Sequence, residues 1–328
     1  MDAAGLRGPT PKQARGPHWL RTSPGLYLPA GVDPDQPHQR VVTAAGVLKP
    51  GEAVTGWAAL AWEEGLWFDG TADGTVPLPV PLVVRRHLTA DSSYSLSQEY
   101  LAPGELMVVD GLPVTPAVRS VCFEARYADT LVAAVVAMDM AAYSDLVSLS
   151  ELAAHVHSRM APTGIGQARR ALGMAVENSW SPQETVMRLV WKGWGPTCRL
   201  LCNVPVFDRT GRHLATPDLL DPEAGVVGEY EGGVHLAAGQ RASDVRREAA
   251  LRSVGLECVT MVAADRADAH VSFLTRLGEA YARAGSSSLE RGWTLERPRW
   301  WVDTSTVSAR RSLDPFLRER LLRHRRAA

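Results

Sequence analysis

Residues 215–235 read ATPDLLDPEAGVVGEYEGGVH, and this stretch decides the fold of the C-terminal half of the chain. The pattern predicts two short apolar strands joined by a tight turn, with Asp218 near the end of the first strand. Glu229 and Glu231 lie two positions apart on the second strand. Alternate residues of a strand share a face, so both glutamates point the same way and Tyr230 points into the opposite layer. We therefore expect three carboxylates at neighbouring positions of one sheet.

Helical and strand patterns alternate on both sides of this stretch. We expect a helix over 167–191, strands over 198–207, 213–220 and 226–231, a helix over 243–254, a strand over 257–262 and a helix over 267–284. This order predicts a mixed sheet flanked by helices, in which an antiparallel meander is followed by a crossover to a parallel strand.

A fourth carboxylate lies on the first of these helices, at Glu184. Carboxylates that sit side by side repel one another unless a cation is bound between them. Hard divalent cations such as Mg²⁺ or Mn²⁺ prefer oxygen ligands, and they can activate water and stabilise a phosphate under attack. The four carboxylates together predict a metal-dependent site for phosphate chemistry.

Two motifs in this half resemble a known family. Pro217-Asp218 followed by Glu229-x-Glu231 resembles the PD-(D/E)XK nuclease superfamily, whose core has the same element order. The Ser-Pro-x-Glu motif that begins at Ser181, and residues 229–255, are similar to the DUF559 and very-short-patch-repair-like endonuclease group. The resemblance covers residues 167–284. It implies a restriction-endonuclease-like three-layer core and a Mg²⁺- or Mn²⁺-dependent DNA endonuclease (a hydrolase) of defence or repair type.

The resemblance also implies roles for the carboxylates. Asp218, Glu229 and the carbonyl of Tyr230 would hold the metal ion, and Glu231 would orient the attacking water. Glu184 would complete a second metal position or support the first. The superfamily has a lysine where this chain has Glu231.

Because Glu231 carries no positive charge, the metal, Arg188 or Arg247 would take over the lysine's role of neutralising charge on the phosphate. Arg247 matches the family pattern, which implies contact with phosphate or pairing with a site carboxylate. His235 also matches it and is either a general acid/base or phosphate ligand, or an ordinary surface or core histidine.

The N-terminal half has a different pattern. We expect two short strands over 19–28, a helix pair over 36–48 and 53–66, strands over 77–87 and 105–113, buried helices over 116–140, and a domain boundary near 161–166. Residues 19–29 and 111–119 resemble an AbiE-type antitoxin-like region. That resemblance implies a winged-helix DNA-binding module, here degenerate because too few residues precede Trp19 for the usual helices.

Composition limits the possible classes of protein. The chain has 328 residues, 45% of them hydrophobic, and 35 basic against 36 acidic residues give a net charge of −1. No stretch of the sequence predicts a membrane span or a secretory leader, so we expect a cytoplasmic protein. The tail over 285–328 is locally basic. Its arginines either form a solvated face of a docked helix or contact a DNA backbone.

We thus expect an α/β protein with three parts. These are an α+β, partly winged-helix-like antitoxin-type domain over 1–160, a nuclease-like domain over 167–284 and a basic tail over 285–328. The expected function is DNA cleavage, with DNA and a toxin or other defence protein as partners and no membrane partner. The alternative is a non-catalytic, antitoxin-like transcriptional regulator that retains a nuclease fold. The sequence indicates no oligomeric state.

Overall fold

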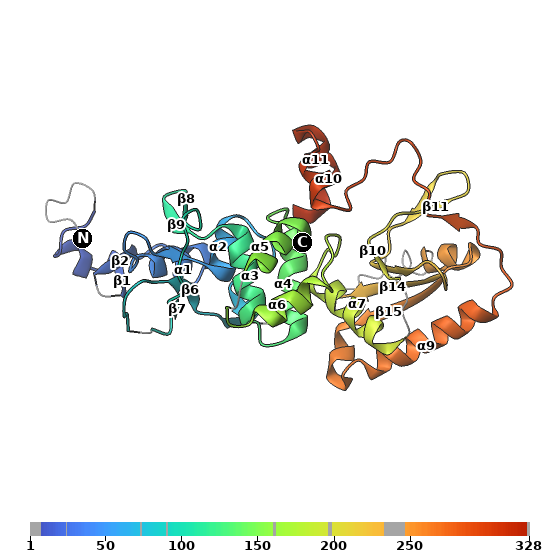
Figure 1. The fold of residues 1–328 in the computed structure, drawn as a ribbon, viewed down its shortest axis with the longest axis horizontal. Coiled ribbons are helices and arrows are strands. Elements are labelled where there is room, and N and C mark those ends of the chain that lie inside the picture. Colours follow the sequence, from blue (N-terminus) through green and yellow to red (C-terminus); the bar gives the residue numbers. More distant parts are fainter. Residues whose placement is uncertain are drawn as a thin grey trace. The chain divides into compact units, whose positions relative to one another are not determined.

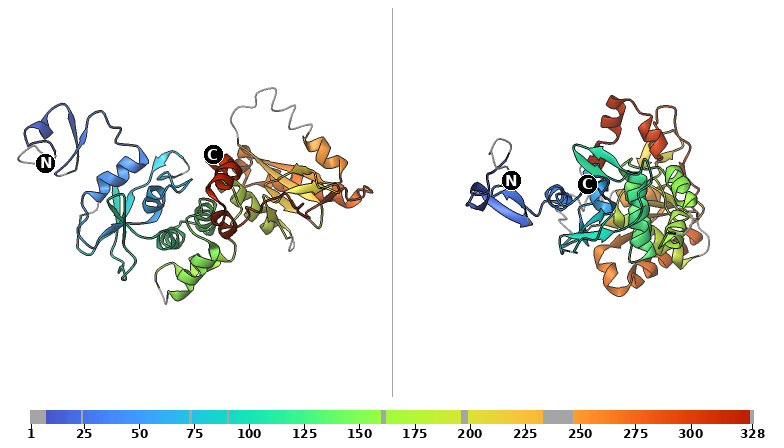
Figure 2. Two further views of the ribbon diagram at one scale, coloured as in Figure 1. Left: turned by 90° about the horizontal axis from the view of Figure 1, so that it is seen from above. Right: turned by 60° about the vertical axis from the view of Figure 1, so that its left-hand side comes forward.

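The chain folds into two compact units (Figure 1). The structure is a computed structural model that describes residues 8–23, 25–72, 74–89, 91–159, 162–195, 199–232 and 247–326; the other ranges are grey on the bar of Figure 2. The first unit consists of Met1–Asp129 with Ser150–Arg170, and the second of Thr130–Leu149 with Ala171–Ala328. In the described ranges, no helix has the length and apolar character needed to cross a membrane.

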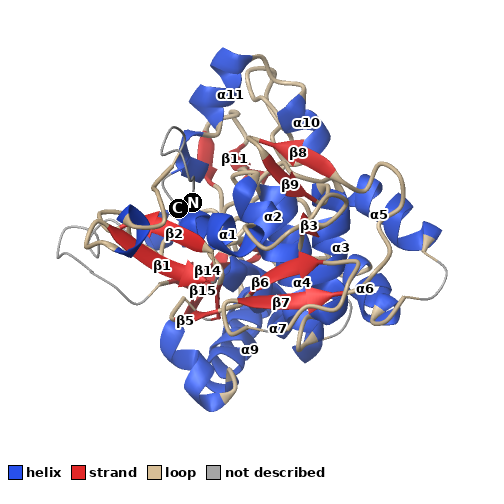
Figure 3. Cartoon of the chain, turned by 90° about the vertical axis from the view of Figure 1, so that its left-hand side faces the viewer, coloured by secondary structure: helices blue, strands red, loops and turns tan. Residues whose placement is uncertain are grey.

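The first unit is built around a five-stranded sheet of order β7-β6-β3-β9-β8, whose strands are labelled in Figure 3. Its elements are η1 (Gln13–Arg15), β1 (Trp19–Ser23), β2 (Leu26–Pro29), α1 (Pro37–Ala45), β3 (Ala53–Val54), α2 (Gly56–Trp62), β4 (Thr71–Ala72), β5 (Val76–Pro77), β6 (Val80–Val83), β7 (Tyr94–Ser97), β8 (Met107–Val109), β9 (Leu112–Val114), α3 (Ala117–Tyr127), α5 (Leu149–Ser158) and α6 (Ile165–Leu172). The predicted hairpin over 19–28 is confirmed, because β1 and β2 pair antiparallel.

The predicted helix over 53–66 is wrong at its start. Ala53 and Val54 are fully buried and pair with β6 as strand β3, and the helix α2 begins only at Gly56. Gly56 has a φ of +58°, a left-handed conformation that favours glycine. Two strand residues buried in a sheet gain more from ladder hydrogen bonds and packing than from their helical pattern.

The second unit contains a mixed four-stranded sheet of order β10-β13-β14-β15. β10 (Leu201–Cys202), β13 (Leu219–Asp221) and β14 (Val226–Glu231) are antiparallel neighbours, and β15 (Glu257–Val262) runs parallel to β14. The described part of the β14–β15 connection includes helical residues 247–253. The structure therefore has antiparallel strands followed by a parallel strand, as predicted, but the hairpin expected at 208–212 joins β11 (Val206–Asp208) and β12 (His213–Ala215) of a separate sheet.

Helices cover both faces of this sheet. On one face lie α7 (Pro182–Trp194) and α9 (Val271–Ser286), whose Trp191 and Phe273 pack in one core cluster with the sheet. On the other face a second cluster joins Leu220 and Val227 to Leu251 of the helix at 247–253. Tyr230 packs with the first cluster, on the opposite face from its neighbour Glu229, as predicted.

Three predicted elements of this unit are divided in the structure. The strand expected over 213–220 is one of them, because residues 213–215 form β12 and residues from Leu219 form β13 in a different sheet. The helix expected over 167–191 is two helices, α6 and α7, because the segment from Gly173 leaves the helix and α7 restarts at Pro182. The strand expected over 198–207 is interrupted at Asn203, which has a φ of +48°. Its second piece, β11 (Val206–Asp208), joins a separate three-stranded sheet with β12 (His213–Ala215) and β16 (Trp293–Thr294).

Helix α4 (Leu131–Tyr143) belongs to the second unit, although the expected boundary placed it in the N-terminal domain. Its Asp139 is fully buried and forms an ion pair with Arg188 of α7, with 2.6 Å between Oδ2 and Nη2. Asp139 also accepts hydrogen bonds from the Val176 amide and the Thr185 hydroxyl. These buried polar contacts join α4 to α7, and an apolar pattern in the sequence cannot show them.

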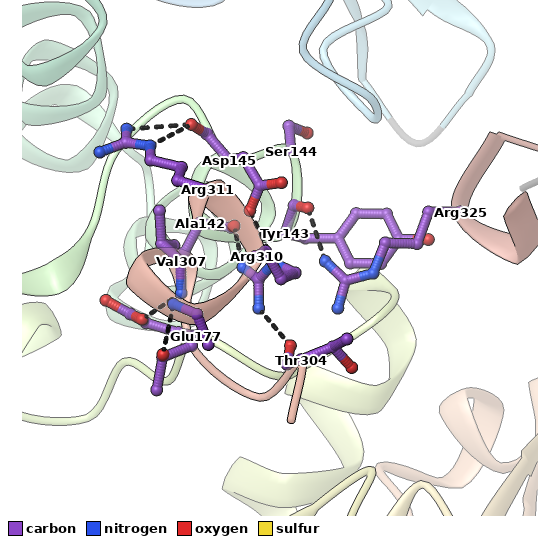
Figure 4. A network of polar contacts seen from close by, with 12 residues as sticks. Ala142, Tyr143, Ser144, Asp145, Glu177, Thr304, Val307, Arg310, Arg311 and Arg325 are labelled. Atoms are coloured by element: carbon purple, nitrogen blue, oxygen red, sulfur yellow. Dashed lines mark hydrogen bonds and ion pairs between the residues drawn. The ribbon is translucent and has the colours of Figure 1, made fainter. Parts of the chain in front are cut away.

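The basic tail also belongs to the second unit (Figure 4). Its elements are α10 (Val307–Arg311), α11 (Pro315–Leu321) and η3 (Arg323–Arg326), and η2 (Ala263–Asp268) precedes α9. Arg310 is fully buried and donates to Asp145, to the Thr304 carbonyl and to the Ala142 carbonyl. Arg325 donates to the Tyr143 carbonyl and lies 4.5 Å from the centre of the Tyr143 ring. Of the two alternatives for the tail, the structure shows docking, and it uses arginines that the sequence had assigned to solvent or DNA.

Candidate active site

Asp218 and Glu229 lie opposite each other at one edge of the four-stranded sheet. The last paired residues of β13 and β14 in this direction are Leu219 and Gly228, and Asp218 and Glu229 come one position further on each strand. Residues opposite each other in an antiparallel pair share a face. The Tyr230 amide donates a 2.7 Å hydrogen bond to Asp218 Oδ2, which holds this carboxylate against β14.

Glu184 reaches this edge from the first turn of α7. Ser181 caps the helix by accepting from the Glu184 amide, and Pro182 occupies the first helical position, so the Ser-Pro-x-Glu motif is also a helix start. The side chain of Glu184 turns back and accepts from the Trp180 amide at 2.8 Å and from Asn203 Nδ2 at 2.7 Å. Glu184 is therefore held in one orientation by two donors.

Both buried carboxylates have raised pKa values. Burial, followed by the negative charge of Asp218, raises the pKa of Glu184 to about 7. Burial also raises the pKa of Asp218, against the opposing effects of the Tyr230 amide and the positive charge of Arg247. A carboxyl group that is half protonated near neutral pH, beside a second acidic group, is typical of catalytic and metal sites.

Arg247 brings a positive charge to the same edge. Its guanidinium forms an ion pair with Glu229, with 2.7 Å between Nη2 and Oε1. Of the two roles implied for Arg247, pairing with a site carboxylate is the one found in the structure. Glu231 lies two residues further on β14, partly exposed and on the same face as Glu229, and it forms no hydrogen bond or ion pair with the described residues.

Two other predicted site residues are not part of this cluster. Arg188 is 1% exposed and donates to Asp139 and to the Met174 carbonyl. A guanidinium held in this way does not face a phosphate, so we assign Arg188 a structural role in place of the predicted DNA contact. His235 lies outside the described residues.

The carboxylates at this edge are oxygen donors, the ligand type that hard divalent cations prefer. Asp218, Glu229 and Glu184 carry carboxylate oxygens. The pKa of Glu184 is raised first by burial and second by the negative charge of Asp218, and a bound cation would offset that charge. In the described residues, no three His, Cys, Asp or Glu side chains already stand in metal-ligating geometry. To bind the ion, Glu229 would have to give up its ion pair with Arg247.

Asn203 is a site residue that the sequence did not suggest. It is buried, donates to Glu184 and to the Asn178 carbonyl, and takes the left-handed conformation that ends β10. Its Oδ1 is buried and has no hydrogen-bond partner among the described residues. Asn tolerates a positive φ better than most residues, but this preference alone does not distinguish a site residue from an ordinary turn residue.

Asn203 also lines a pocket of about 310 Å³ beside the carboxylates. Trp180 and Thr216 line it from the segments that lead to Glu184 and Asp218, and Trp300 and Trp301 line it from the segment before α10. The pocket and the carboxylates thus share the same chain segments.

The raised pKa of Glu184 predicts a pH-dependent stability in the absence of divalent cations. The folded chain holds a proton on Glu184 up to about pH 7, whereas the unfolded chain releases it near the ordinary pKa of 4.5. The protonated Glu184 therefore contributes to the free energy of unfolding, and this contribution is fully present below pH 4.5. It amounts to at most about 3 kcal/mol and is lost as the pH rises to about 7. Glu184→Gln keeps an oxygen acceptor but no charge, so it should match the wild type near pH 4.5 and unfold at a higher temperature at pH 8.

Thermal unfolding of both proteins in EDTA from pH 4.5 to 8 measures this difference. Glu279→Gln, on the exposed surface of α9, is the matched control and should follow the wild type at every pH. Parallel curves for Glu184→Gln and wild type would show that Glu184 titrates normally in the folded chain.

Comparison with known proteins gives no relative for this chain: no protein family, no curated protein and no solved structure matches it.

Proposed function

We propose that the second unit is a metal-dependent DNA endonuclease with a PD-(D/E)XK-like, three-layer core. The observation that carries this proposal is the buried pair Glu184 and Asp218 at one edge of a mixed sheet, with Glu229 opposite Asp218 in the strand register. Carboxylates that are buried close together destabilise a fold. A bound cation would offset their negative charges. The fold around them supports the proposal through its antiparallel strands and parallel last strand.

The residues divide into three roles. Asp218, Glu229 and the Tyr230 carbonyl would hold Mg²⁺ or Mn²⁺, and Glu184 would support Asp218 or complete a second metal position. When bound, the ion supplies Lewis-acid stabilisation of the charge on phosphate. Arg247 would add a second positive charge near the phosphate once it leaves Glu229.

Glu231 would orient the attacking water and accept its proton. The water oxygen bonds to phosphorus, one phosphorus–oxygen ester bond breaks, and the leaving oxygen takes a proton from solvent. A carboxylate suits this role because it accepts a proton and needs no partner of its own in the site. The position of Glu231 at the end of β14, on the face of Glu229, supports the assignment.

Calorimetric titration with Mn²⁺, followed by plasmid nicking with Mg²⁺ or Mn²⁺, tests the proposal. The wild type should bind Mn²⁺ and nick DNA, and Asp218→Asn should do neither. The asparagine oxygen can still accept from the Tyr230 amide, so the fold should be kept. Glu223→Gln, at an exposed position in the turn after β13, is the control and should behave as wild type. Equal Mn²⁺ binding by Asp218→Asn and wild type would refute the metal site.

One observation favours a second candidate, a non-catalytic DNA-binding regulator. The Arg247–Glu229 ion pair neutralises a carboxylate that the metal needs, as expected in a nuclease fold kept as a scaffold. An antitoxin-like first unit, with a toxin or other defence protein as partner, would fit this candidate. It predicts DNA binding without Mn²⁺ binding and without nicking on duplex, single-stranded or mismatched DNA.

A further inference from the structure

The pocket beside the carboxylates has aromatic walls. Trp180, Trp300 and Trp301 line it, and Trp300 is 60% exposed although it is a large aromatic side chain. Trp300 and Trp301 meet edge to face, with 5.6 Å between their ring centres, and Trp301 stacks on His213 at 5.3 Å. The two tryptophans are therefore held by aromatic neighbours, while one ring stays open to solvent.

Several polar side chains of the pocket are paired, and one buried polar atom of its lining is not. Thr216 is hydrogen-bonded to His213, and Arg297 forms an ion pair with Asp303. The residue that lines the pocket with an unmet buried acceptor is Asn203, through its Oδ1. Leaving a buried polar atom unpaired is costly, so a ligand that brings an N–H group would gain there what the free protein lacks.

The pocket lies next to the sheet edge that carries the carboxylates, and this position limits the class of ligand. Thr216 stands two residues before Asp218, and Asn203 donates to Glu184, so a molecule in the pocket lies next to the proposed cleavage site. Arg320 also lines the pocket and adds a positive charge. A flat ring with N–H groups, attached to an anionic backbone, meets all of these features.

We propose that this pocket binds one unstacked nucleobase of single-stranded or frayed DNA, next to the phosphate that is cleaved. The inference rests on the proposed function in taking DNA as the substrate. The base would stack on Trp300, as sequence-tolerant single-strand binders stack bases on aromatic rings. Its N–H groups would reach Asn203 Oδ1 only after the Asn203 side chain turns toward the pocket, because that oxygen is buried in the free protein. Intact duplex cannot offer a base to the pocket without first breaking a pair, so the enzyme should prefer single-stranded DNA.

Fluorescence anisotropy in EDTA tests the pocket without cleavage. Three labelled ligands of equal length are compared: a mixed-sequence single strand, the blunt duplex of that sequence, and a strand made entirely of abasic sites. The full-length wild type should bind the single strand more tightly than either of the others. Trp300→Ala should weaken binding to the single strand about 5- to 150-fold, the range for loss of one base–aromatic stack, and leave binding to the abasic strand unchanged.

Two variants keep this result interpretable. Trp300→Phe retains a ring and should keep most of the affinity, which excludes a general loss of structure. Trp194→Ala removes another exposed tryptophan, on α7 and outside the pocket lining, and should bind as wild type. Equal binding of the single strand and the abasic strand by the wild type, or an equal loss for both with Trp300→Ala, overturns the base pocket.

The plasmid nicking assay separates this inference from the proposed function. Asp218-dependent nicking, with unchanged single-strand affinity in Trp300→Ala, would keep the nuclease and refute the base pocket. Loss of single-strand affinity in Trp300→Ala, with no nicking by wild type in Mg²⁺ or Mn²⁺, would keep the pocket and refute the nuclease.

Discussion

Exchanging Glu231 for glutamine should slow DNA cleavage about 10²- to 10⁴-fold, the range expected when general-base assistance is lost. A glutamine can still hold a water by hydrogen bonding, but it accepts a proton poorly. Because Glu231 is not needed to hold the ion in the proposed site, Mn²⁺ affinity should change little. Glu231 is partly exposed and has no partner among the described residues, so the fold should also be unaffected.

Initial rates of plasmid nicking, at saturating Mg²⁺, measure the effect. Glu223→Gln makes the same chemical change at an exposed position in the turn between β13 and β14 and should nick at the wild-type rate. A wild-type nicking rate in Glu231→Gln would refute the general-base role of Glu231. Persistent nicking by Asp218→Asn would identify a contaminating nuclease.

Replacing Asp139 with asparagine should destabilise the second unit by about 3–5 kcal/mol, the usual cost of leaving one member of a buried ion pair uncompensated. Asp139 is fully buried and Arg188 is 1% exposed, so neither charge can be solvated in the folded chain. Without the carboxylate, Arg188 keeps its hydrogen bond to the Met174 carbonyl but loses its only ion pair in the described residues.

Urea unfolding of the full chain, followed by tryptophan fluorescence, measures this loss as a lower midpoint. The double variant Asp139→Leu with Arg188→Met removes both charges and should recover much of the stability, since apolar replacements of a buried pair are often neutral or better. Glu248→Gln breaks the exposed Arg252–Glu248 pair and should cost no more than about 1 kcal/mol. A similarly small loss for Asp139→Asn would contradict the assigned role of the pair.

The sequence by itself predicted the central strands of the second unit with their exact bounds. Strands β14 and β15 occupy Val226–Glu231 and Glu257–Val262, the bounds expected from the sequence. The shared face of Glu229 and Glu231, and the opposite direction of Tyr230, follow from the period of a strand. These features depend on residues close together in the chain, so the sequence carries them directly.

The assembly of the site depended on tertiary structure. Nothing near Asn203 in the sequence shows that it will bond to Glu184, and nothing near Trp300 shows that it will share a pocket with Trp180. The same holds for Arg188 and Arg310, whose patterns fit DNA contacts but whose guanidiniums are buried against Asp139 and Asp145. A buried charge meets its partner only when distant elements pack together, and the ion pair then offsets the cost of removing the charge from water.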